Sequence, residues 1–467
     1  RRVLFRSYFE TERTAFTIPG HKQKAHRLDE GLGTVVDSDT PLYGGLDEIK
    51  LTEGTLKKAE ALAASLWGAQ YARFSTGGST HANQAIILAL GKPGDKIAVT
   101  RTAHRSVLSA LVLTGLEPIW LTPEIDGATG VPMGIPVSEL ERVLDQKPIA
   151  LLLTEPGYLG TISELSALIT KAHENSIPVI IDAAWGAHFG FNQNIPQHVL
   201  QLGADALITS VHKALPGYSA SALLLAQGNL LNLDRIEQSF ETTHTTSPAG
   251  APLASIDACR ALLQTRGEEL TGQLLNNVKA FKSAVQSNFD QPIFLNPEQF
   301  PTGRFDPVKI VLRANLLGLS GVDVEKQLQK ANIRVEMADR DTIVFLATLA
   351  DNADDFKVLE NALVPILKSL QGPARETQTS LSWSVVPKVG ISIRDAYFAD
   401  TEFVSAQEAI GRISADLIAP YPPGVAVVAP GEVLTEQIVN GLAATQQAGV
   451  RIAYASDSTL ATYRVTK

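Results

Sequence analysis

The stretch Tyr71-Ala72-Arg73-Phe74-Ser75-Thr76-Gly77-Gly78-Ser79-Thr80-His81 joins a predicted strand to a predicted helix through two adjacent glycines. Residues 71–75 form the strand candidate, and the apolar residues of 81–90 recur at helical spacing. The same order, a short apolar run followed by a helical segment, recurs from about residue 51 to residue 225. This alternation predicts an α/β domain with a largely parallel central sheet.

The pattern changes after this region, where an α+β lobe is predicted. The predicted strands are residues 71–75, 96–99, 118–121, 149–153, 179–181, 206–208 and 222–225, followed in the second lobe by 308–312, 333–336 and 342–346. The predicted helices are residues 56–67, 81–90, 105–113, 165–175, 257–289, 322–331 and 353–370. We therefore expect an N-terminal arm (1–50), a large domain (51–290), a small domain (291–372) and a C-terminal segment (373–467).

Composition excludes several classes of protein. The chain has 467 residues, of which 45% are apolar and 19% charged, as in ordinary globular proteins and unlike collagen, coiled coils or disordered chains. Lys and Arg number 40 against 49 Asp and Glu, so the net charge is −9, which argues against binding to nucleic acid or anionic membranes. The one cysteine, Cys259, and the lack of a long apolar run fit a soluble protein of the reducing cytoplasm.

The glycine pair suggests an anion-binding loop. Glycines allow close approach of a ligand to the backbone, and a helix start offers free N–H groups to a phosphate. Ser79 and Thr80 add hydroxyl donors beside Gly78. The alternative is a Ser or Thr N-cap on an ordinary helix. No Lys follows the glycines at the spacing of a Walker loop.

Three further polar residues also follow predicted strands, where an open α/β sheet places its ligands. Asp182 follows 179–181 and could pair with a protonated ring nitrogen, or serve as an N-cap. Lys213, in Ser210-Val211-His212-Lys213, could react with an aldehyde, or be a surface charge. His104 could stack on a flat ring, or be a loop donor. A phosphate loop, a carboxylate and a lysine are together what pyridoxal phosphate (PLP) requires, so we predict a PLP site.

The chain resembles the Orn/Lys/Arg decarboxylase family, which has an aminotransferase-like fold. The resemblance runs from residue 17 almost to the C-terminus. It is carried by Pro19-Gly20-His21-Lys22, Leu46-Asp47-Glu48-Ile49, Thr76-Gly77-Gly78-Ser79-Thr80, Asp182-Ala183-Ala184-Trp185, Ser210-Val211-His212-Lys213, Thr245-Thr246-Ser247-Pro248, Pro422-Pro423-Gly424 and Pro430-Gly431-Glu432.

The resemblance implies a role for each matched residue. Lys213 is similar to the Schiff-base lysine and Asp182 to the partner of the pyridinium nitrogen. His104 and Ala184 resemble the residues on the two faces of the cofactor ring, and His104 or Lys213 is the candidate acid. The implied phosphate ligands are Ser79, Thr80, Ser210 and His212, at the loop that contains Gly78. Ser247 resembles a residue that reaches the neighbouring subunit's site, which implies at least a homodimer.

The predicted reaction is decarboxylation of a basic amino acid to its amine and carbon dioxide, with arginine favoured over lysine or ornithine by the resemblance alone. An aminotransferase or lyase would share the same cofactor residues, and Arg394 is a candidate carboxylate ligand for that alternative. A catalytically inactive PLP-binding regulatory protein is the alternative of another class. Glu432 and Asp457 are weaker candidates for binding a basic side chain, and a structural role is expected for His188 and Cys259.

Overall fold

The computed structural model describes residues 54–421 and 424–467, together with positions 22, 25–28, 30, 31, 36, 39, 40 and 46. Most of the predicted N-terminal arm lies outside the described residues, as do nearly all of the motifs at 19–22 and 46–49 and both prolines of the motif at 422–424. A short 3₁₀ helix, η1 (Ala25–Arg27), precedes the first long helix.

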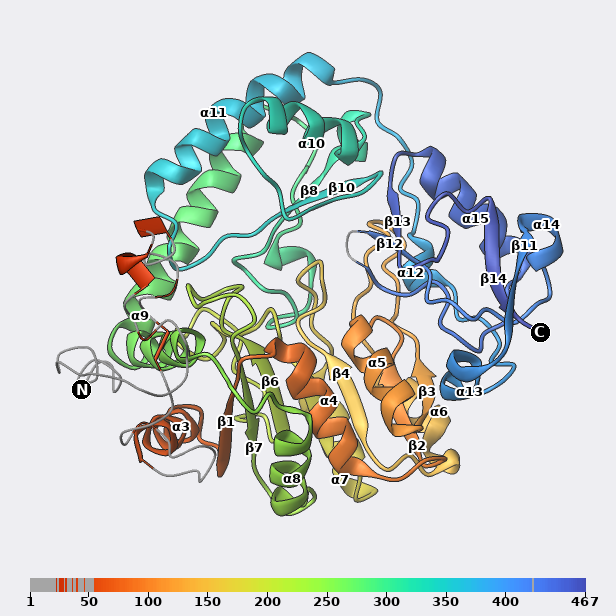
Figure 1. Ribbon diagram of the computed structural model, residues 1–467. Helices are drawn as coiled ribbons and strands as arrows, with labels where there is room; N and C mark the ends of the chain where they lie inside the picture. Colours follow the sequence, from red (N-terminus) through yellow and green to blue (C-terminus); the bar gives the residue numbers. More distant parts are fainter. Residues whose placement is uncertain are drawn as a thin grey trace.

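A seven-stranded sheet forms the centre of the molecule, with the strand order β1-β7-β6-β5-β4-β2-β3 (Figure 1). The strands are β1 (Tyr71–Ser75), β2 (Lys96–Thr100), β3 (Glu117–Leu121), β4 (Leu151–Thr154), β5 (Val179–Asp182), β6 (Ala206–Ser210) and β7 (Ala222–Ala226). Neighbouring strands from β3 to β6 are parallel, whereas β7 is antiparallel to both β6 and β1. The predicted largely parallel α/β sheet is therefore confirmed.

Both faces of this sheet are covered by helices. Helices α4 (Gly78–Leu90), α5 (Arg105–Thr114) and α8 (Leu233–Thr243) pack on one face, and α3 (Gly54–Trp67), α6 (Val137–Val143), α7 (Leu165–Glu174) and α9 (Gly250–Gln286) pack on the other. Successive residues of a strand point to opposite faces, so Leu151 and Leu153 join one core cluster while Leu152 joins the other. Double burial explains why the strands appear in the sequence as continuous apolar runs.

The long helix α9 leads into a smaller lobe built on a three-stranded antiparallel sheet (Figure 1). Its elements are β8 (Ile310–Arg313), α10 (Gly321–Lys330), β9 (Met337–Ala338), β10 (Thr342–Phe345) and α11 (Ala353–Leu370). The 3₁₀ helices η2 (Leu144–Gln146), η3 (Pro297–Gln299) and η4 (Ala314–Leu317) lie in the connections. The predicted strand at 333–336 is wrong, because the paired residues of this segment are Met337 and Ala338, next to the turn that sets the register.

The C-terminal segment has its own apolar core, which includes Ile418, Val428, Leu434, Ile438 and Leu442. Its strands are β11 (Thr401–Ser405), paired with β14 (Thr462–Thr466), and β12 (Ala419–Tyr421), paired with β13 (Arg451–Ala453). Its helices are α12 (Leu381–Ser384), α13 (Ile393–Phe398), α14 (Ala406–Ala409) and α15 (Glu436–Gln447). Residues 371–377, which precede the C-terminal segment, contain no helix or strand, while the four-part domain division stays a prediction. Within the described residues, no helix is long and apolar enough to span a bilayer.

Candidate functional site

The glycine loop lies between β1 and α4. Gly78 has a φ of +70°, which favours glycine, and Gly77 occupies the N-cap position of α4. No side chain caps this helix, so the predicted alternative of a Ser or Thr N-cap is wrong. The Ser79 hydroxyl instead bonds the Ser210 hydroxyl at 2.8 Å. The start of α4 and the end of β6 thus form one polar surface, whose helix N–H groups suit an anion.

Asp182 ends β5 and is 1% exposed. Its Oδ2 accepts a hydrogen bond from the Asn83 amide at 2.8 Å, and its Oδ1 accepts one from the Ala184 backbone N–H at 3.1 Å. In the parallel register Asp182 lies beside Ile208 of β6, two positions before Ser210. No cation bonds this carboxylate among the described residues, so the buried carboxylate is available to a cationic ligand.

His104 is connected to Asp182 through two polar side chains. The Ser106 backbone N–H donates to His104 Nδ1 at 3.2 Å, and the Ser106 hydroxyl lies 2.9 Å from the same nitrogen. Asn83 donates to that hydroxyl at 3.0 Å and also to Asp182. Because Nδ1 accepts from a backbone N–H, the neutral ring carries its proton on Nε2. Burial lowers the pKa of His104, opposed by Asp182 and reinforced by Lys213 and Arg105.

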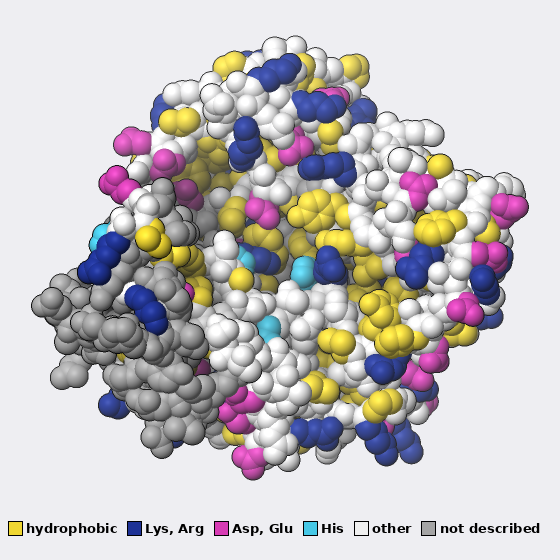
Figure 2. All heavy atoms as spheres, viewed as in Figure 1, with side chains coloured by type: hydrophobic (Ala, Val, Ile, Leu, Met, Phe, Trp, Pro, Cys, Tyr) yellow, Lys and Arg dark blue, Asp and Glu magenta, His cyan; other side chains and the backbone are white. Residues whose placement is uncertain are grey.

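Lys213 follows β6, and its Nζ lies 4.4 Å from the centre of the Trp185 ring. Burial lowers the pKa of Lys213, against the attraction of Asp182 and Glu336. The neighbouring His212 donates from Nδ1 to the Ser221 carbonyl at 3.0 Å. Figure 2 shows a hollow near the middle of the molecule where histidine, basic and hydrophobic side chains gather.

Two of the predicted residues are exposed. Thr80 lies on the first turn of α4 and makes no hydrogen bond through its side chain to a described residue. Ser247 lies in the loop between α8 and α9, where its N–H donates to the Thr245 hydroxyl at 3.2 Å. The start of that loop contacts the glycine loop, since His244 Nε2 is 3.2 Å from the Thr76 hydroxyl. The predicted roles of Thr80 and Ser247 stay predictions.

Sequence reasoning missed Asn83 and Ser106, which link His104 to Asp182, and Lys309, which lies beside Trp185 with its Nζ 4.0 Å from the ring centre. Asn83 and Ser106 have no distinctive spacing. Lys309 did carry a signal, because it is a charged residue inside the apolar run 308–312 that was predicted as a strand.

The weaker C-terminal candidates have structural partners. The Arg101 guanidinium forms two hydrogen bonds to the Glu432 carboxylate, at 2.6 and 2.9 Å, and both side chains are almost fully buried. The Asp457 carboxylate accepts from the backbone and hydroxyl groups of Thr459 and Thr462, which lowers its pKa. Neither carboxylate is therefore available for a substrate side chain.

Arg394 also has a structural role. Its guanidinium donates to the carbonyls of Val112 and Leu113 at the C-terminal end of α5, at 2.7 and 2.8 Å. This position does not support Arg394 as the carboxylate ligand of an aminotransferase. His188 bonds Asp306 at 3.2 Å within the core, and Cys259 is buried, as expected for structural residues.

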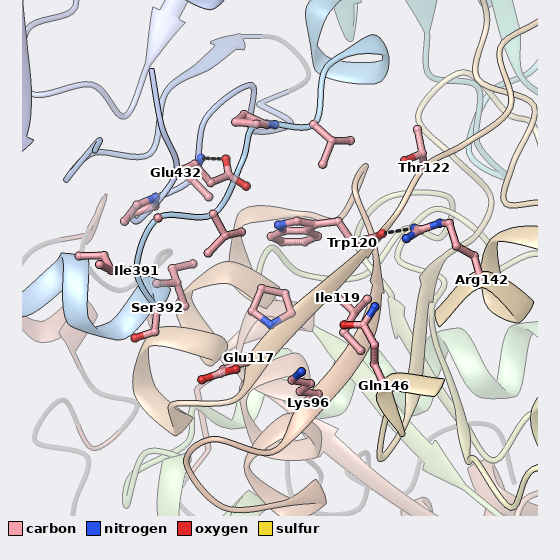
Figure 3. A pocket seen from close by; sticks show the side chains of 18 residues that line it. Lys96, Glu117, Ile119, Trp120, Thr122, Arg142, Gln146, Ile391, Ser392 and Glu432 are labelled. Atoms are coloured by element: carbon pink, nitrogen blue, oxygen red, sulfur yellow. Dashed lines mark hydrogen bonds between the residues drawn. The ribbon is translucent and has the colours of Figure 1, made fainter. Parts of the chain in front are cut away.

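A pocket of about 670 Å³ lies between the sheet edge at β3 and the C-terminal segment (Figure 3). Trp120, Arg142 and Glu432 line it, and Arg142 donates to the Trp120 carbonyl at 2.9 Å. None of the predicted cofactor residues is among the described residues that line this pocket. It is therefore separate from the residues around Lys213 and Asp182.

Comparisons with known proteins identify the family of the chain. The family model "Orn/Lys/Arg decarboxylase, major domain" matches residues 3–355, and "Orn/Lys/Arg decarboxylase, C-terminal domain" matches residues 382–452. The chain is 32% identical to an arginine decarboxylase of Bacillus subtilis over 464 residues, covering 97% of this chain and 94% of the relative.

Solved lysine decarboxylases share the fold. The structure of lysine decarboxylase A from Pseudomonas aeruginosa has a TM-score of 0.82 at 19% identity, covering 99% of this chain and 80% of that one. The constitutive lysine decarboxylase of E. coli has a TM-score of 0.81 at 20% identity, covering 99% and 81%. The predicted aminotransferase-like fold is thereby confirmed. The chain belongs to the Orn/Lys/Arg decarboxylase family, whose members are PLP-dependent carboxy-lyases, as its motifs predicted.

Proposed function

We propose that this chain decarboxylates arginine to its amine and carbon dioxide, with PLP held by the residues around Lys213 and Asp182. The observation that carries the proposal is the convergence of Asp182, Lys213 and the uncapped start of α4 at the ends of β5, β6 and β1. Arginine is the proposed substrate because relatives that match over nearly the whole chain are arginine decarboxylases.

The residues present fit the chemical groups of PLP. The uncapped N–H groups of α4 and the hydroxyls of Ser79, Thr80 and Ser210 offer donors for the phosphate, and His212 lies two positions after Ser210. The buried Asp182 carboxylate, which lacks a cationic partner among the described residues, would hold the protonated ring nitrogen. Lys213 supplies an amine for the aldehyde, and the neutral His104 ring and Ala184 would flank the cofactor ring. Bound PLP supplies an acceptor for the electron pair that remains on Cα when the carboxylate leaves.

The protein residues have separate tasks in this proposal. Asn83 and the Ala184 N–H hold the Asp182 carboxylate in place, which preorganises a negative charge toward the ring nitrogen. Burial lowers the pKa of Lys213, which increases the fraction of neutral amine. His104, whose proton is on Nε2, and Lys213 are the two candidates for donating a proton to Cα.

We further propose that the active unit is a homodimer. Ser247 is exposed in this chain, on a loop whose start contacts the glycine loop at Thr76. An exposed loop next to the site is available to a second subunit. Mixed dimers test this: Lys213→Ala and Ser247→Arg chains, each inactive alone, should regain activity on mixing, because one of the two sites in a mixed dimer is then intact. No regained activity would contradict shared sites.

The proposed reaction is tested by the release of labelled carbon dioxide from carboxyl-labelled arginine, lysine and ornithine in the presence of PLP. We expect release from arginine, and its loss in Lys213→Ala. Lys326→Ala, which alters a side chain that is 61% exposed, is the matched control and should keep full activity. Release from lysine or ornithine instead would contradict the substrate, and no release from any of them would contradict the reaction.

A further inference from the structure

A second lysine lies next to the proposed cofactor lysine and has no role in the proposal above. Lys309 is only 5% exposed, and its Nζ is 4.0 Å from the centre of the Trp185 ring. The Nζ of Lys213 is 4.4 Å from the centre of the same ring. The amines of two lysines thus lie against the same indole ring.

The position of Lys309 is fixed by the backbone around it. Gly160 has a φ of +93°, and a Cβ there would lie only 2.8 Å from Lys309 Cγ. The Lys309 backbone N–H donates to the Asp306 carbonyl at 3.0 Å, and the Asp306 N–H donates to the Gly160 carbonyl at 2.8 Å. The first carbons of the Lys309 side chain therefore lie against the loop after β4.

The charge of Lys309 is not neutralised by a direct partner. Among the described residues, none forms a hydrogen bond or ion pair with its amine. Asp306 and Glu336 attract its charge and Lys213 repels it, and burial lowers its pKa to about 8. Asp306 is itself bonded to His188. Burying a charged amine without a hydrogen-bond partner costs free energy. A function for Lys309 would account for its burial beside Lys213.

The charges that face Lys213 are Asp182, Glu336, His104 and Lys309. The two carboxylates favour the protonated amine of Lys213, whereas repulsion between the two lysines is mutual and disfavours it. Because both amines are largely removed from solvent, water screens this repulsion less than it would at the surface. A lysine beside another cation is a known arrangement for making its amine nucleophilic.

We propose that Lys309 is a positioning residue whose charge keeps Lys213 in the uncharged form that reacts with the cofactor aldehyde. The inference rests on the proposed function of Lys213. In that reaction the lone pair of the amine adds to the aldehyde carbon, a carbon–nitrogen double bond forms, and the aldehyde oxygen leaves as one molecule of water. A protonated amine has no lone pair for this step, so the charge of Lys309 accelerates it.

The test measures covalent capture of PLP as a function of pH, by borohydride reduction of the full chain after PLP has been removed and added back. Lys309→Met keeps the length of the side chain and removes its charge. We expect half-maximal capture to move about one unit higher in pH, and capture at neutral pH to slow about tenfold. Lys309→Arg, which keeps the charge, should restore the original profile.

A second variant keeps the inference testable if Lys309→Met fails to fold. Lys309→Gln also removes the charge but keeps a polar group at the end of the side chain, so half-maximal capture should again move to higher pH. An unchanged profile in Lys309→Met together with normal capture by the parent chain would overturn the inference. Failure of the parent chain to incorporate PLP at Lys213, with Lys213→Ala as the blank, would instead overturn the proposed function.

Discussion

The buried ion pair of Arg101 and Glu432 joins the end of β2 to the C-terminal segment, and breaking it should destabilise the protein strongly. Both side chains are at most 2% exposed, and the two hydrogen bonds between them measure 2.6 and 2.9 Å. Arg101 also donates to the Val427 carbonyl at 2.9 Å and lies over the Trp120 ring. Replacing Arg101 by Met leaves the Glu432 carboxylate with the Ala429 N–H as its hydrogen-bond donor, at 2.7 Å.

The magnitude follows from what remains buried. Removing one partner of a buried ion pair costs about 3–5 kcal/mol, because the other charge is left without compensation in a low-dielectric interior. Removing both charges leaves no such penalty. We therefore expect Arg101→Met to lower the free energy of unfolding by about 4 kcal/mol, and the double variant Arg101→Met/Glu432→Met to regain more than half of that loss.

The free energy of unfolding is measured by urea denaturation of the PLP-loaded protein, followed by tryptophan fluorescence. The matched control is Arg266→Met, which breaks an ion pair with Glu269 whose side chains are about half exposed. Its cost should stay below about 1 kcal/mol. The reasoning is refuted if Arg101→Met costs no more than Arg266→Met, or if the double variant is less stable than Arg101→Met alone.

Three further changes have expected outcomes. Asn83→Leu removes the 2.8 Å donor to Asp182, and because a hydrogen bond to a charged group contributes about 1.5–3 kcal/mol, PLP affinity measured by equilibrium dialysis should fall at least tenfold. Gly78→Ala should lower the free energy of unfolding by about 1–2 kcal/mol, because residue 78 has a φ of +70°. Gly127→Ala should leave it unchanged, because a Cβ at residue 127 meets no atom within 4 Å. Burial raises the pKa of Glu155 from 4.5 to about 7, so its contribution to stability is complete below 4.5 and lost as pH rises to about 7. The free energy of unfolding of the parent protein should therefore fall by about 3 kcal/mol between pH 4.5 and about 7, and this fall should be absent in Glu155→Gln. An equal fall in both proteins would contradict the assignment to Glu155.

The sequence predicted the central sheet well because its strands are buried on both faces. Residues 179–181 and 206–208 are continuous apolar runs, and they lie side by side as β5 and β6. Parallel strands have their carboxyl ends at one edge, so the convergence of Asp182 with the segment leading to Lys213 also followed from the pattern. Neither conclusion needed knowledge of a contact between distant residues.

In the small lobe the same reasoning predicted the wrong residues for one strand. Residues 333–336 alternate between apolar and charged, as a half-buried strand does, yet the strand is Met337–Ala338. The side chain of Asp339 accepts from the N–H groups of Asp341 and Thr342, at 2.8 and 2.6 Å. This tight turn sets the register with β10, so the residues next to the turn form the pairs. The geometry of the turn sets the pairing register, and an alternating pattern of apolar and charged residues does not specify that geometry.

Assigning a partner to each charged residue required the structure, because the type of a charged residue does not specify which distant residue it contacts. Glu432 is 331 positions from Arg101, and as a residue type it is as suitable for a basic substrate as for an arginine of the same chain. Arg394 is in the same way a reasonable carboxylate ligand until its guanidinium is found on the carbonyls of Val112 and Leu113. Lys309 is the opposite case, since a lysine that was not predicted as a site residue lies beside the indole that Lys213 also contacts. A charged side chain whose hydrogen-bonding groups already have protein partners is not available to bind a ligand. Glu432 and Arg394 have such partners, whereas the amines of Lys213 and Lys309 have none among the described residues.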